Sequence, residues 1–138
     1  MKQLVYLSGP MGGCTFETMT EWRAYVEERL NSPTLKCTLP TRSFKKNHIP
    51  KETDKWVNRR DYYDCTRANC VFVNLLGMKH LSIGTIMEVA WAYQAQIPVI
   101  CVCEPDGPQN HPMMKDCITQ EVHTLDEGID FVKEILSE

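Results

Sequence analysis

Two carboxylate residues, Glu88 and Asp61, are the side chains best placed to do chemistry in this sequence. Glu88 follows Ser82-Ile83-Gly84-Thr85, a segment expected to begin a helix. The N-terminus of a helix favours an ionised carboxylate, which suits a nucleophile. Glycosyl chemistry typically uses a second carboxyl group, and Asp61 could supply it. In this functional interpretation, the pair would act at a sugar carbon.

Both carboxylates also have purely structural interpretations. Thr85 and Glu88 fit the S/T-x-x-E pattern of a capping box, in which Glu88 would only return to the start of its helix. Asp61 lies in a charged segment where Arg60 and Asp64 could form an i,i+4 pair on a solvated helix face. The local pattern leaves both interpretations open.

A glycine-rich segment, Gly9-Pro10-Met11-Gly12-Gly13, follows the first apolar run. It is not a P-loop, because it lacks the GK[ST] ending, and it does not fit GxGxxG. Its glycines would let a ligand approach backbone N–H groups at the start of the next helix, where an anion is favoured. The alternative is a tight turn that binds nothing.

Short apolar segments alternate with segments of helical periodicity, and these elements must position the carboxylates. We expect Trp56, Tyr62 and Tyr63 to face inward from their helix. The polar segment 41–55 and the proline-rich segment 104–114 are expected to be loops. The pattern predicts strands at 4–7, 36–39, 70–76, 98–103 and near 120–123, and helices at 15–30, 55–67, 85–95 and 125–136.

This order of elements predicts an α/β fold with a mainly parallel five-stranded sheet covered on both faces. The length of 138 residues fits a single domain over residues 1–138. Ligands on open parallel sheets bind at the carboxyl ends of the strands. The segments that follow the strands, 8–13, 74–85 and 104–114, are therefore where a site is expected.

The composition excludes several classes of protein. Apolar residues make up 43% and charged residues 24%, which is typical of a globular chain. The longest apolar runs are too short to span a membrane, and the N-terminal run is too short for a signal peptide, so a cytoplasmic location is expected. A net charge of −3 argues against binding a nucleic-acid polymer. The basic segment 42–60 is either a solvated loop or an attractor for an anionic small molecule.

The seven cysteines form an odd set without a CxxC pair, so the sequence indicates neither a disulfide framework nor a metal site. Cys70, Cys101 and Cys103 lie in apolar runs and are expected to be buried thiols. No cofactor is expected.

Four motifs occur in order along the chain. They are Tyr6-Leu7-Ser8-Gly9-Pro10, then Arg60-Asp61 with Ala68-Asn69-Cys70-Val71-Phe72-Val73-Asn74, then Ser82-x-Gly84-Thr85-x-x-Glu88-Val89-Ala90-Trp91-Ala92, and finally Pro98-Val99-Ile100. Together they resemble the nucleoside 2-deoxyribosyltransferase family over roughly residues 4–136. The resemblance implies a flavodoxin-like or Rossmann-like three-layer sandwich that forms homodimers or larger homo-oligomers, with each active site completed by the partner subunit.

The resemblance also implies roles for individual residues. Glu88 matches the family's nucleophile, Asp61 the carboxylate that assists the departing or incoming base, and Tyr6 the aromatic residue that orients the nucleophile. Asn110 lies in a late segment with two interpretations. The segment reaches an active site, its own or the partner's, or it is an exposed loop. The expected substrate-binding residues are Gly9, Pro10, Met11, Ser82, Gly84 and Asn110.

The implied function is cleavage of the N-glycosidic bond of a 2′-deoxyribonucleoside through a covalent deoxyribosyl-Glu88 intermediate, with transfer of the sugar to another nucleobase. Ser82 replaces an Asp common in transferases and resembles the deoxynucleoside 5′-monophosphate N-glycosidases, so hydrolysis is an alternative. Those hydrolases tend to carry Arg where this chain has Gly12. A non-catalytic nucleotide sensor is a third reading, which two carboxylates beside an anionic ligand disfavour. The choice between purine and pyrimidine stays open.

Overall fold

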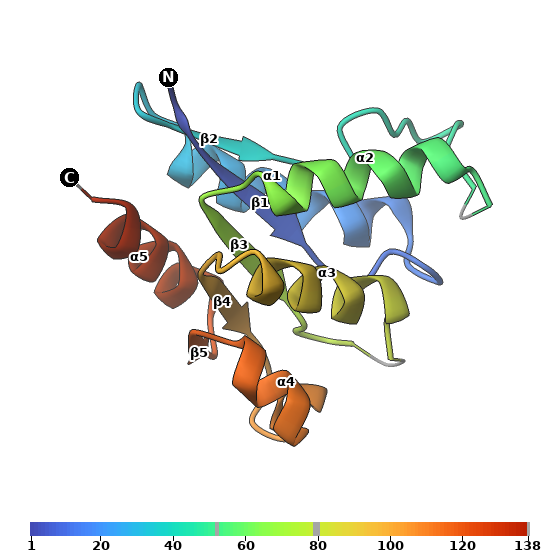
Figure 1. The fold of residues 1–138 in the computed structure, drawn as a ribbon. Coiled ribbons are helices and arrows are strands. Elements are labelled where there is room, and N and C mark those ends of the chain that lie inside the picture. Colours follow the sequence, from blue (N-terminus) through green and yellow to red (C-terminus); the bar gives the residue numbers. More distant parts are fainter. Residues whose placement is uncertain (52, 79–80, 138) are drawn as a thin grey trace.

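The computed structural model describes residues 1–51, 53–78 and 81–137, so part of the segment 74–85, where a site is expected, lies outside the described residues. The five strands pair in parallel in the order β2-β1-β3-β4-β5 (Figure 1). The strands are β1 (Gln3–Ser8), β2 (Leu35–Thr38), β3 (Cys70–Asn74), β4 (Val99–Val102) and β5 (Gln120–Val122). The helices are α1 (Phe16–Leu30), α2 (Lys55–Thr66), α3 (Ile83–Gln94), the 3₁₀ turn η1 (Pro108–Asn110), α4 (Pro112–Cys117) and α5 (Leu125–Leu136).

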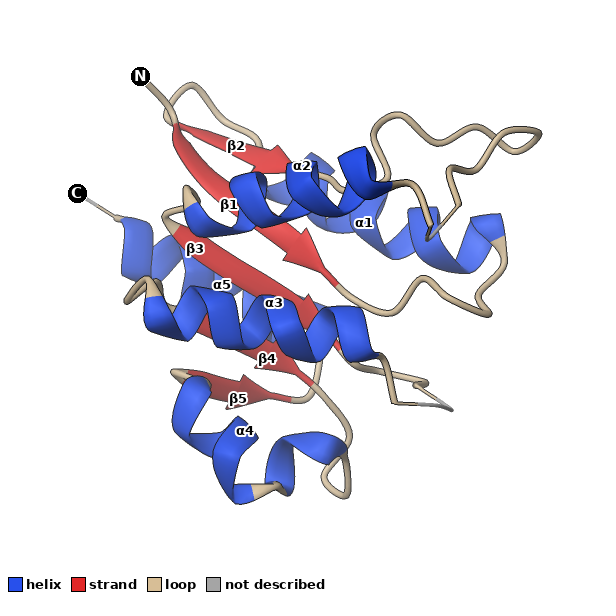
Figure 2. Cartoon of the chain, turned by 45° about the vertical axis from the view of Figure 1, so that its right-hand side comes forward, coloured by secondary structure: helices blue, strands red, loops and turns tan. Residues whose placement is uncertain are grey.

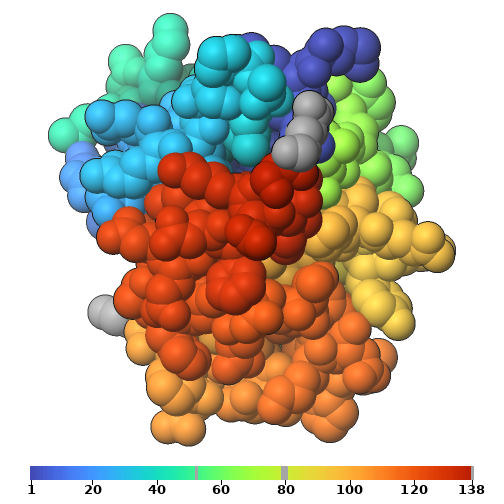
Figure 3. All heavy atoms as spheres, turned by 90° about the vertical axis from the view of Figure 1, so that its left-hand side faces the viewer, coloured from blue at the N-terminus to red at the C-terminus, as the bar shows by residue number. Residues whose placement is uncertain are grey.

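Helices cover both faces of the sheet, as the alternating elements predict. Helices α2 and α3 lie on one face of the sheet, and α1 and α5 lie on the other (Figure 2). On that second face, α5 lies beside α1 and contacts it (Figure 3). Leu7 and Phe72 point toward α1 and α5, whereas Tyr6 and Val73 belong to the cluster beneath α2 and α3. Because successive strand residues alternate between faces, β1 contributes to both cores.

The strand order places a crevice between β1 and β3. In this flavodoxin-like order, the connections leaving the two central strands run to opposite faces, and ligands bind at the carboxyl ends beside that switch point. Ser8 ends β1 and Asn74 ends β3 at this edge. The predicted fold class is therefore confirmed, and the fold itself identifies where a site should lie.

The expected orientation of α2 is wrong. Trp56 and Tyr63 are 55% and 60% exposed, and Tyr62 is exposed too. The buried positions of the helix are instead Val57, Asp61, Asp64 and Cys65. These positions share one helical face, and two of them are acidic. The helix thus turns its carboxylates inward and its aromatic rings outward, the reverse of an ordinary amphipathic helix.

The late segment is more ordered than its three prolines suggested. Residues 104–114, expected to be a loop, contain η1 and the start of α4. Pro108 and Pro112 begin these two elements, where a missing backbone N–H costs nothing. In the last helix, Ile129 and Val132 are buried and Leu125 packs against the same core.

The cysteines follow the expectation of free, buried thiols. Cys70, Cys101 and Cys103 are fully buried, and all seven cysteines are unpaired. Among the described residues, no helix combines the length and apolar character that crossing a membrane requires.

Candidate active site

A cleft of about 1470 Å³ opens at the carboxyl end of β1. The glycine-rich first loop (residues 9–13), part of the segment after β2, α2 and the start of α3 surround it. The sequence-predicted residues that line it are Gly9, Pro10, Met11, Asp61, Ser82, Gly84 and Glu88.

Glu88 is the most constrained side chain of this cleft. It lies in α3 with only 6% of its surface exposed, facing the end of β1. The Tyr6 hydroxyl donates a hydrogen bond to Glu88 Oε2, and the Ser8 hydroxyl donates one to Oε1 at 2.7 Å. Tyr6 and Ser8 share a face of β1 because they are two residues apart. The strand thus presents one donor to each carboxylate oxygen.

The capping interpretation of Glu88 is wrong. Ser82, not Thr85, is the N-cap of α3, and its hydroxyl accepts the backbone N–H of Thr85 at 3.3 Å. Glu88 is the sixth helical residue, and the first turn contains no acidic side chain. The ionised form of Glu88 is therefore stabilised by the two hydroxyl donors of β1 and not, as expected, by the N-terminus of its helix.

The pKa of Glu88 reflects competition between burial and these donors. Desolvation raises the pKa to about 7, while the hydrogen bonds from Tyr6 and Ser8 and the charge of Arg23 lower it; the charge of Asp61 raises it. Without the donors, a carboxyl so buried would be protonated at neutral pH. The hydroxyls therefore keep the ionised form of Glu88 accessible near neutral pH.

Tyr6→Phe is expected to lower kcat about tenfold to a hundredfold, because a hydrogen bond to a charged group is lost. The optimum of the pH profile should also move to higher pH, since the Tyr6 donor lowers the pKa of Glu88. Steady-state kinetics across pH measure both effects. Tyr25→Phe is the matched control, because the Tyr25 hydroxyl bonds to Asp126 at the surface, away from the cleft. A pH optimum that stays in place would contradict the role given to Tyr6.

Asp61 is the second buried carboxyl of the cleft. Burial raises its pKa to about 6, opposed by the charge of Arg60, whose Nε lies 3.7 Å from Asp61 Oδ1. Arg60 is itself held by the carbonyl of Pro40 at 2.6 Å and the hydroxyl of Ser43 at 2.9 Å. A carboxyl that titrates near neutral pH is suited to give and take a proton.

The expected pairing of Arg60 with Asp64 is wrong. Asp64 pairs with Arg42 at 2.7 Å and with Arg67 at 3.3 Å, behind the cleft. Arg60 is thereby left beside Asp61. Asp61 and Asp64 are therefore buried beside arginines and do not belong to the solvated face of the structural alternative.

The first loop needs a glycine where it leaves the sheet. A Cβ on Gly9 would lie 2.9 Å from the Trp22 ring and 3.0 Å from the carbonyl oxygen of Asn74. This close packing brings the loop down onto the end of the sheet and forms the floor of the cleft. Gly9 therefore serves backbone packing as well as any ligand.

Two residues of this region, Ser8 and Arg23, are not among the site residues predicted from the sequence. The prediction ends the first strand at residue 7, whereas Ser8 belongs to β1 and shares a face of this strand with Tyr6. Arg23 lies on the buried stripe of α1 with Met19 and Val26, and none of its surface is exposed. The helical spacing from Met19 was the available signal for Arg23.

Asn110 is not brought to the cleft of its own chain. It is exposed on η1, and its side-chain amide donates to the carbonyl of Pro105 at 2.7 Å. A contact with a partner's cleft remains a prediction.

One group of possible metal ligands lies elsewhere. Cys103, Glu121 and His123 bring one ligand atom each within 4.8 Å of one another, through the pairing of β4 and β5 and not through local spacing. Burial raises the pKa of the Cys103 thiol to about 11, and this thiol donates to the carbonyl of Val122. His123 Nδ1 lies 2.9 Å from the Cys103 carbonyl oxygen. Only a cation that displaces the thiol proton could bind there.

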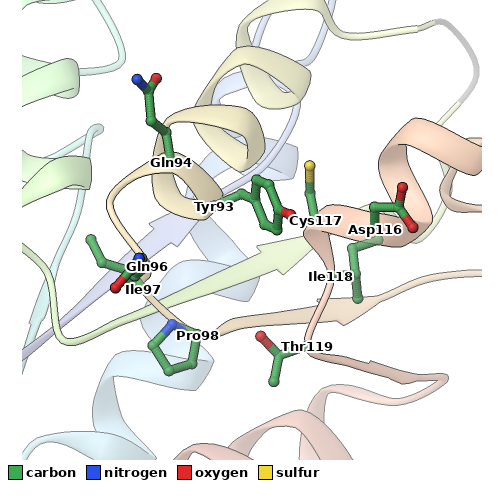
Figure 4. Close-up of a pocket in the computed structure, with 9 residues that line it drawn as sticks. All are labelled: Tyr93, Gln94, Gln96, Ile97, Pro98, Asp116, Cys117, Ile118 and Thr119. Atoms are coloured by element: carbon green, nitrogen blue, oxygen red, sulfur yellow. The ribbon is translucent and has the colours of Figure 1, made fainter.

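A second pocket of about 580 Å³ lies at the other end of the sheet, where α3 ends and β4 begins (Figure 4). It contains one carboxylate, Asp116, and a half-buried thiol, Cys117. It therefore lacks the paired carboxyl groups of the cleft at Glu88. Its lining residues are Tyr93, Gln94, Gln96, Ile97, Pro98, Asp116, Cys117, Ile118 and Thr119.

Solved structures share this fold at low sequence identity. A conserved protein from Enterococcus faecalis is 16% identical with a TM-score of 0.75, over 99% of this chain and 100% of that one. A 2-deoxyribosyltransferase from Bacillus psychrosaccharolyticus is 19% identical, with a TM-score of 0.66 over 90% of this chain and 88% of that one. A 3-dehydroquinate dehydratase-like protein from Bifidobacterium longum is 14% identical with a TM-score of 0.56, over the whole of both chains. These likenesses establish the fold alone.

The family follows from the sequence match. No curated protein matches the chain. The family model described as nucleoside 2-deoxyribosyltransferase, however, matches residues 5–127, a range that contains Tyr6, Asp61 and Glu88. The resemblance drawn from the four motifs is thereby confirmed, and the chain belongs to the nucleoside 2-deoxyribosyltransferase family, a family of enzymes that act on nucleosides and nucleobases.

Proposed function

We propose that this protein cleaves the N-glycosidic bond of 2′-deoxyribonucleosides and transfers the deoxyribosyl group to another nucleobase. One observation carries the proposal: a buried carboxylate, Glu88, has a hydroxyl donor on each oxygen and lines the same cleft as a second buried carboxyl, Asp61. Such a pair supplies a fixed nucleophile and a proton carrier, the two functions of a retaining glycosyl transfer.

In the first step, an ionised oxygen of Glu88 attacks C1′ of the sugar. The C1′–N bond breaks, its electron pair goes to the base, and protonated Asp61 gives its proton to a base nitrogen. The product is a deoxyribosyl ester of Glu88 and a neutral free base. Absence of a 2′-hydroxyl on the sugar makes the oxocarbenium-like transition state easier to reach.

In the second step, a nitrogen of the incoming base attacks C1′ from the face opposite the ester. Asp61 accepts the proton that this base loses, and the ester bond breaks to regenerate ionised Glu88. Two inversions at C1′ give net retention. Because the two carboxyl groups titrate near pH 7 and pH 6, turnover is expected to be bell-shaped with pH.

A second candidate is hydrolysis of a deoxynucleoside 5′-monophosphate. Lys51 and Arg59 line the cleft together with the Ser82 hydroxyl, and these groups favour an anionic substrate. Other cations of the basic segment are committed elsewhere, since Arg42 pairs with Asp64 and Lys46 with Glu17. In this reaction, water would replace the incoming base in the second step.

One assay distinguishes the candidates. The protein is incubated with each deoxynucleoside and each 5′-monophosphate, with and without a free acceptor base, and products are separated by chromatography. A new nucleoside that forms only with acceptor supports transfer. Free base released from monophosphates without acceptor supports hydrolysis. Release of no base from any substrate would remove the enzymatic proposal and favour a nucleotide sensor.

We further infer a homodimer that pairs through the outer surface of α2 and α3. Trp56, Tyr63 and Tyr93 are all more than half exposed there, and Tyr62 packs edge-on against Trp91. A cluster of exposed aromatic rings is typical of a protein interface. This surface adjoins the cleft, so a partner that covers it would complete the active site.

Tyr63→Glu is expected to convert the dimer to monomers, because a charge would be buried at the interface. Sedimentation velocity measures the change. Phe131→Glu is the control, since Phe131 is 37% exposed on α5, on the opposite face of the sheet. A dimer that persists in Tyr63→Glu, or a monomeric wild-type protein, would refute this interface.

A further inference from the structure

We propose that Arg23 is a positioning residue of this active site: its buried guanidinium fixes the end of β1 and the first loop, and its positive charge balances ionised Glu88. The inference rests on the proposed function for its kinetic consequences. Its structural and electrostatic parts concern the protein without substrate and can be tested separately.

Arg23 has an unusual environment for a charged side chain. None of its surface is exposed, and burying a guanidinium is costly unless its charge is compensated. Its hydrogen-bond acceptors are all backbone carbonyl oxygens, those of Met19 at 2.7 Å, Gly9 at 3.1 Å and Leu7 at 3.2 Å. Within the described part of the chain, no carboxylate forms an ion pair with it. An apolar side chain would fill the same space without the desolvation cost of a charge, so packing alone does not account for an arginine at this position.

Two of these three carbonyls belong to the segment that builds the site. Leu7 lies between Tyr6 and Ser8, the two residues that donate to Glu88. Gly9 is the first residue of the loop that forms the floor of the cleft. The guanidinium fork joins these two carbonyls from the α1 side of the sheet and holds them to one helix. Arg23 therefore sets the position of both donors and of the loop beneath the substrate.

The charge of Arg23 acts on the same carboxylate. Burial lowers the pKa of Arg23 to about 10, so the side chain remains a cation at neutral pH. Arg23 stabilises ionised Glu88 and thereby lowers the pKa of this carboxyl group. The other titratable groups that face Glu88 are Tyr6 of β1, and Asp61 and Cys65 of α2. Tyr6 and Cys65 remain neutral, because burial raises the pKa of each. The charge of Asp61 opposes the ionisation of Glu88, and the charge of Arg23 favours it, in addition to the two hydroxyl donors.

The test measures the ionisation of Glu88 directly. Protein labelled with carbon-13 at the Glu carboxyl carbons is titrated by NMR, and the Glu88 signal is assigned by its absence in Glu88→Gln. Arg23→Met is expected to raise the titration midpoint of Glu88, because the charge of Arg23 lowers the pKa of this carboxyl group and its guanidinium holds the strand that carries the two hydroxyl donors. Arg29→Met removes one positive charge from the exposed end of the same helix, where Arg29 stacks on Tyr25, and should leave the midpoint unchanged. An unchanged midpoint in folded Arg23→Met would overturn the electrostatic role.

Arg23→Lys tests the positive charge separately from the paired hydrogen bonds that the guanidinium makes to Leu7 and Gly9. It retains the cation but cannot bind the carbonyls of Leu7 and Gly9 in the same geometry, so we expect a smaller rise of the Glu88 midpoint than in Arg23→Met and a kcat/KM at least about tenfold lower. Wild-type kinetics in Arg23→Lys would overturn the positioning role. If Arg23→Met does not fold, Arg23→Gln, which is neutral and retains hydrogen-bond donors, provides the midpoint comparison. The titrations need no substrate, so a protein that cleaves no nucleoside would refute the proposed function and leave this result intact.

Discussion

Glu88→Gln is expected to reduce turnover by about four orders of magnitude or more, because an amide cannot attack C1′. Glutamine keeps the shape of the side chain and the acceptor for one of the two hydroxyls of β1. The hydroxyl that faces the new amide nitrogen can rotate and accept a hydrogen bond. The loss of activity should therefore occur without loss of the fold, as kinetics and circular dichroism would show together.

The same substitution is expected to stabilise the protein at alkaline pH. The pKa of Glu88 is raised on folding from 4.5 to about 7, so the folded state binds the proton more tightly than the unfolded state. The stability contributed by the protonated carboxyl is fully present below pH 4.5 and is lost as the pH rises through 7. A neutral amide does not incur this loss. At pH 8, the free energy of unfolding should exceed that of the wild type by about 1–3 kcal/mol, and the difference should vanish near pH 4.5.

Thermal unfolding at both pH values measures this difference. Glu134→Gln is the control, because Glu134 is exposed on α5 and its substitution should change neither turnover nor stability. Activity near the wild-type level in Glu88→Gln would assign the nucleophile elsewhere. A variant less stable than the wild type at pH 8 would contradict the buried, charge-disfavouring environment of Glu88.

Asp61→Asn is expected to lower kcat by about two to three orders of magnitude, because the leaving base no longer receives a proton. The loss should be less than about tenfold for a deoxyriboside with a 4-nitrophenolate leaving group, which departs without protonation. The alkaline limb of the pH profile should also be lost, since the decline of rate at alkaline pH follows the deprotonation of Asp61. Rates on the natural and activated substrates across pH provide the measurement.

Asp130→Asn serves as the control, because Asp130 is exposed on α5, away from the cleft. An equal loss on both substrates would show that Asp61 acts on something other than the leaving base. An alkaline limb that persists would mean that another group supplies the proton.

The sheet was predictable because its strands follow the simplest physical rule. Strands buried on both faces are nearly continuous apolar runs, and β3 and β4 have this pattern. The alternation of strands with helices then fixed the parallel pairing and the edge that carries the cleft. The glycine-rich loop and Glu88 could be assigned to this edge from the sequence alone.

The wrong predictions concern helices in which charged residues occupy buried positions. Helix α2 buries Asp61 and Asp64 and exposes Trp56 and Tyr63, so its apolar residues indicate the wrong face. Arg23 occupies a core position of α1 for the same reason. Functional sites commonly break local rules in this way, and only contacts distant in sequence explain them.

The hydrogen bonds to Glu88 illustrate the limit of local pattern. They join residues 80 and 82 positions apart, whereas the capping box would have joined neighbours. Thr85 and Glu88 have the S/T-x-x-E spacing but do not form a capping box, because Ser82 already caps the helix. The Cys103–Glu121–His123 group was missed for a similar reason, since strand pairing brings it together.

The configuration at C1′ of the first-formed product tests the covalent role of Glu88 most directly. A β-deoxynucleoside is incubated with the protein and methanol as acceptor, which gives a methyl glycoside that cannot mutarotate, and the anomeric proton is followed by NMR. Attack by Glu88 followed by methanol inverts C1′ twice and predicts the β-anomer. The α-anomer would show a single displacement without a glycosyl-enzyme ester, and would contradict Glu88 as the nucleophile.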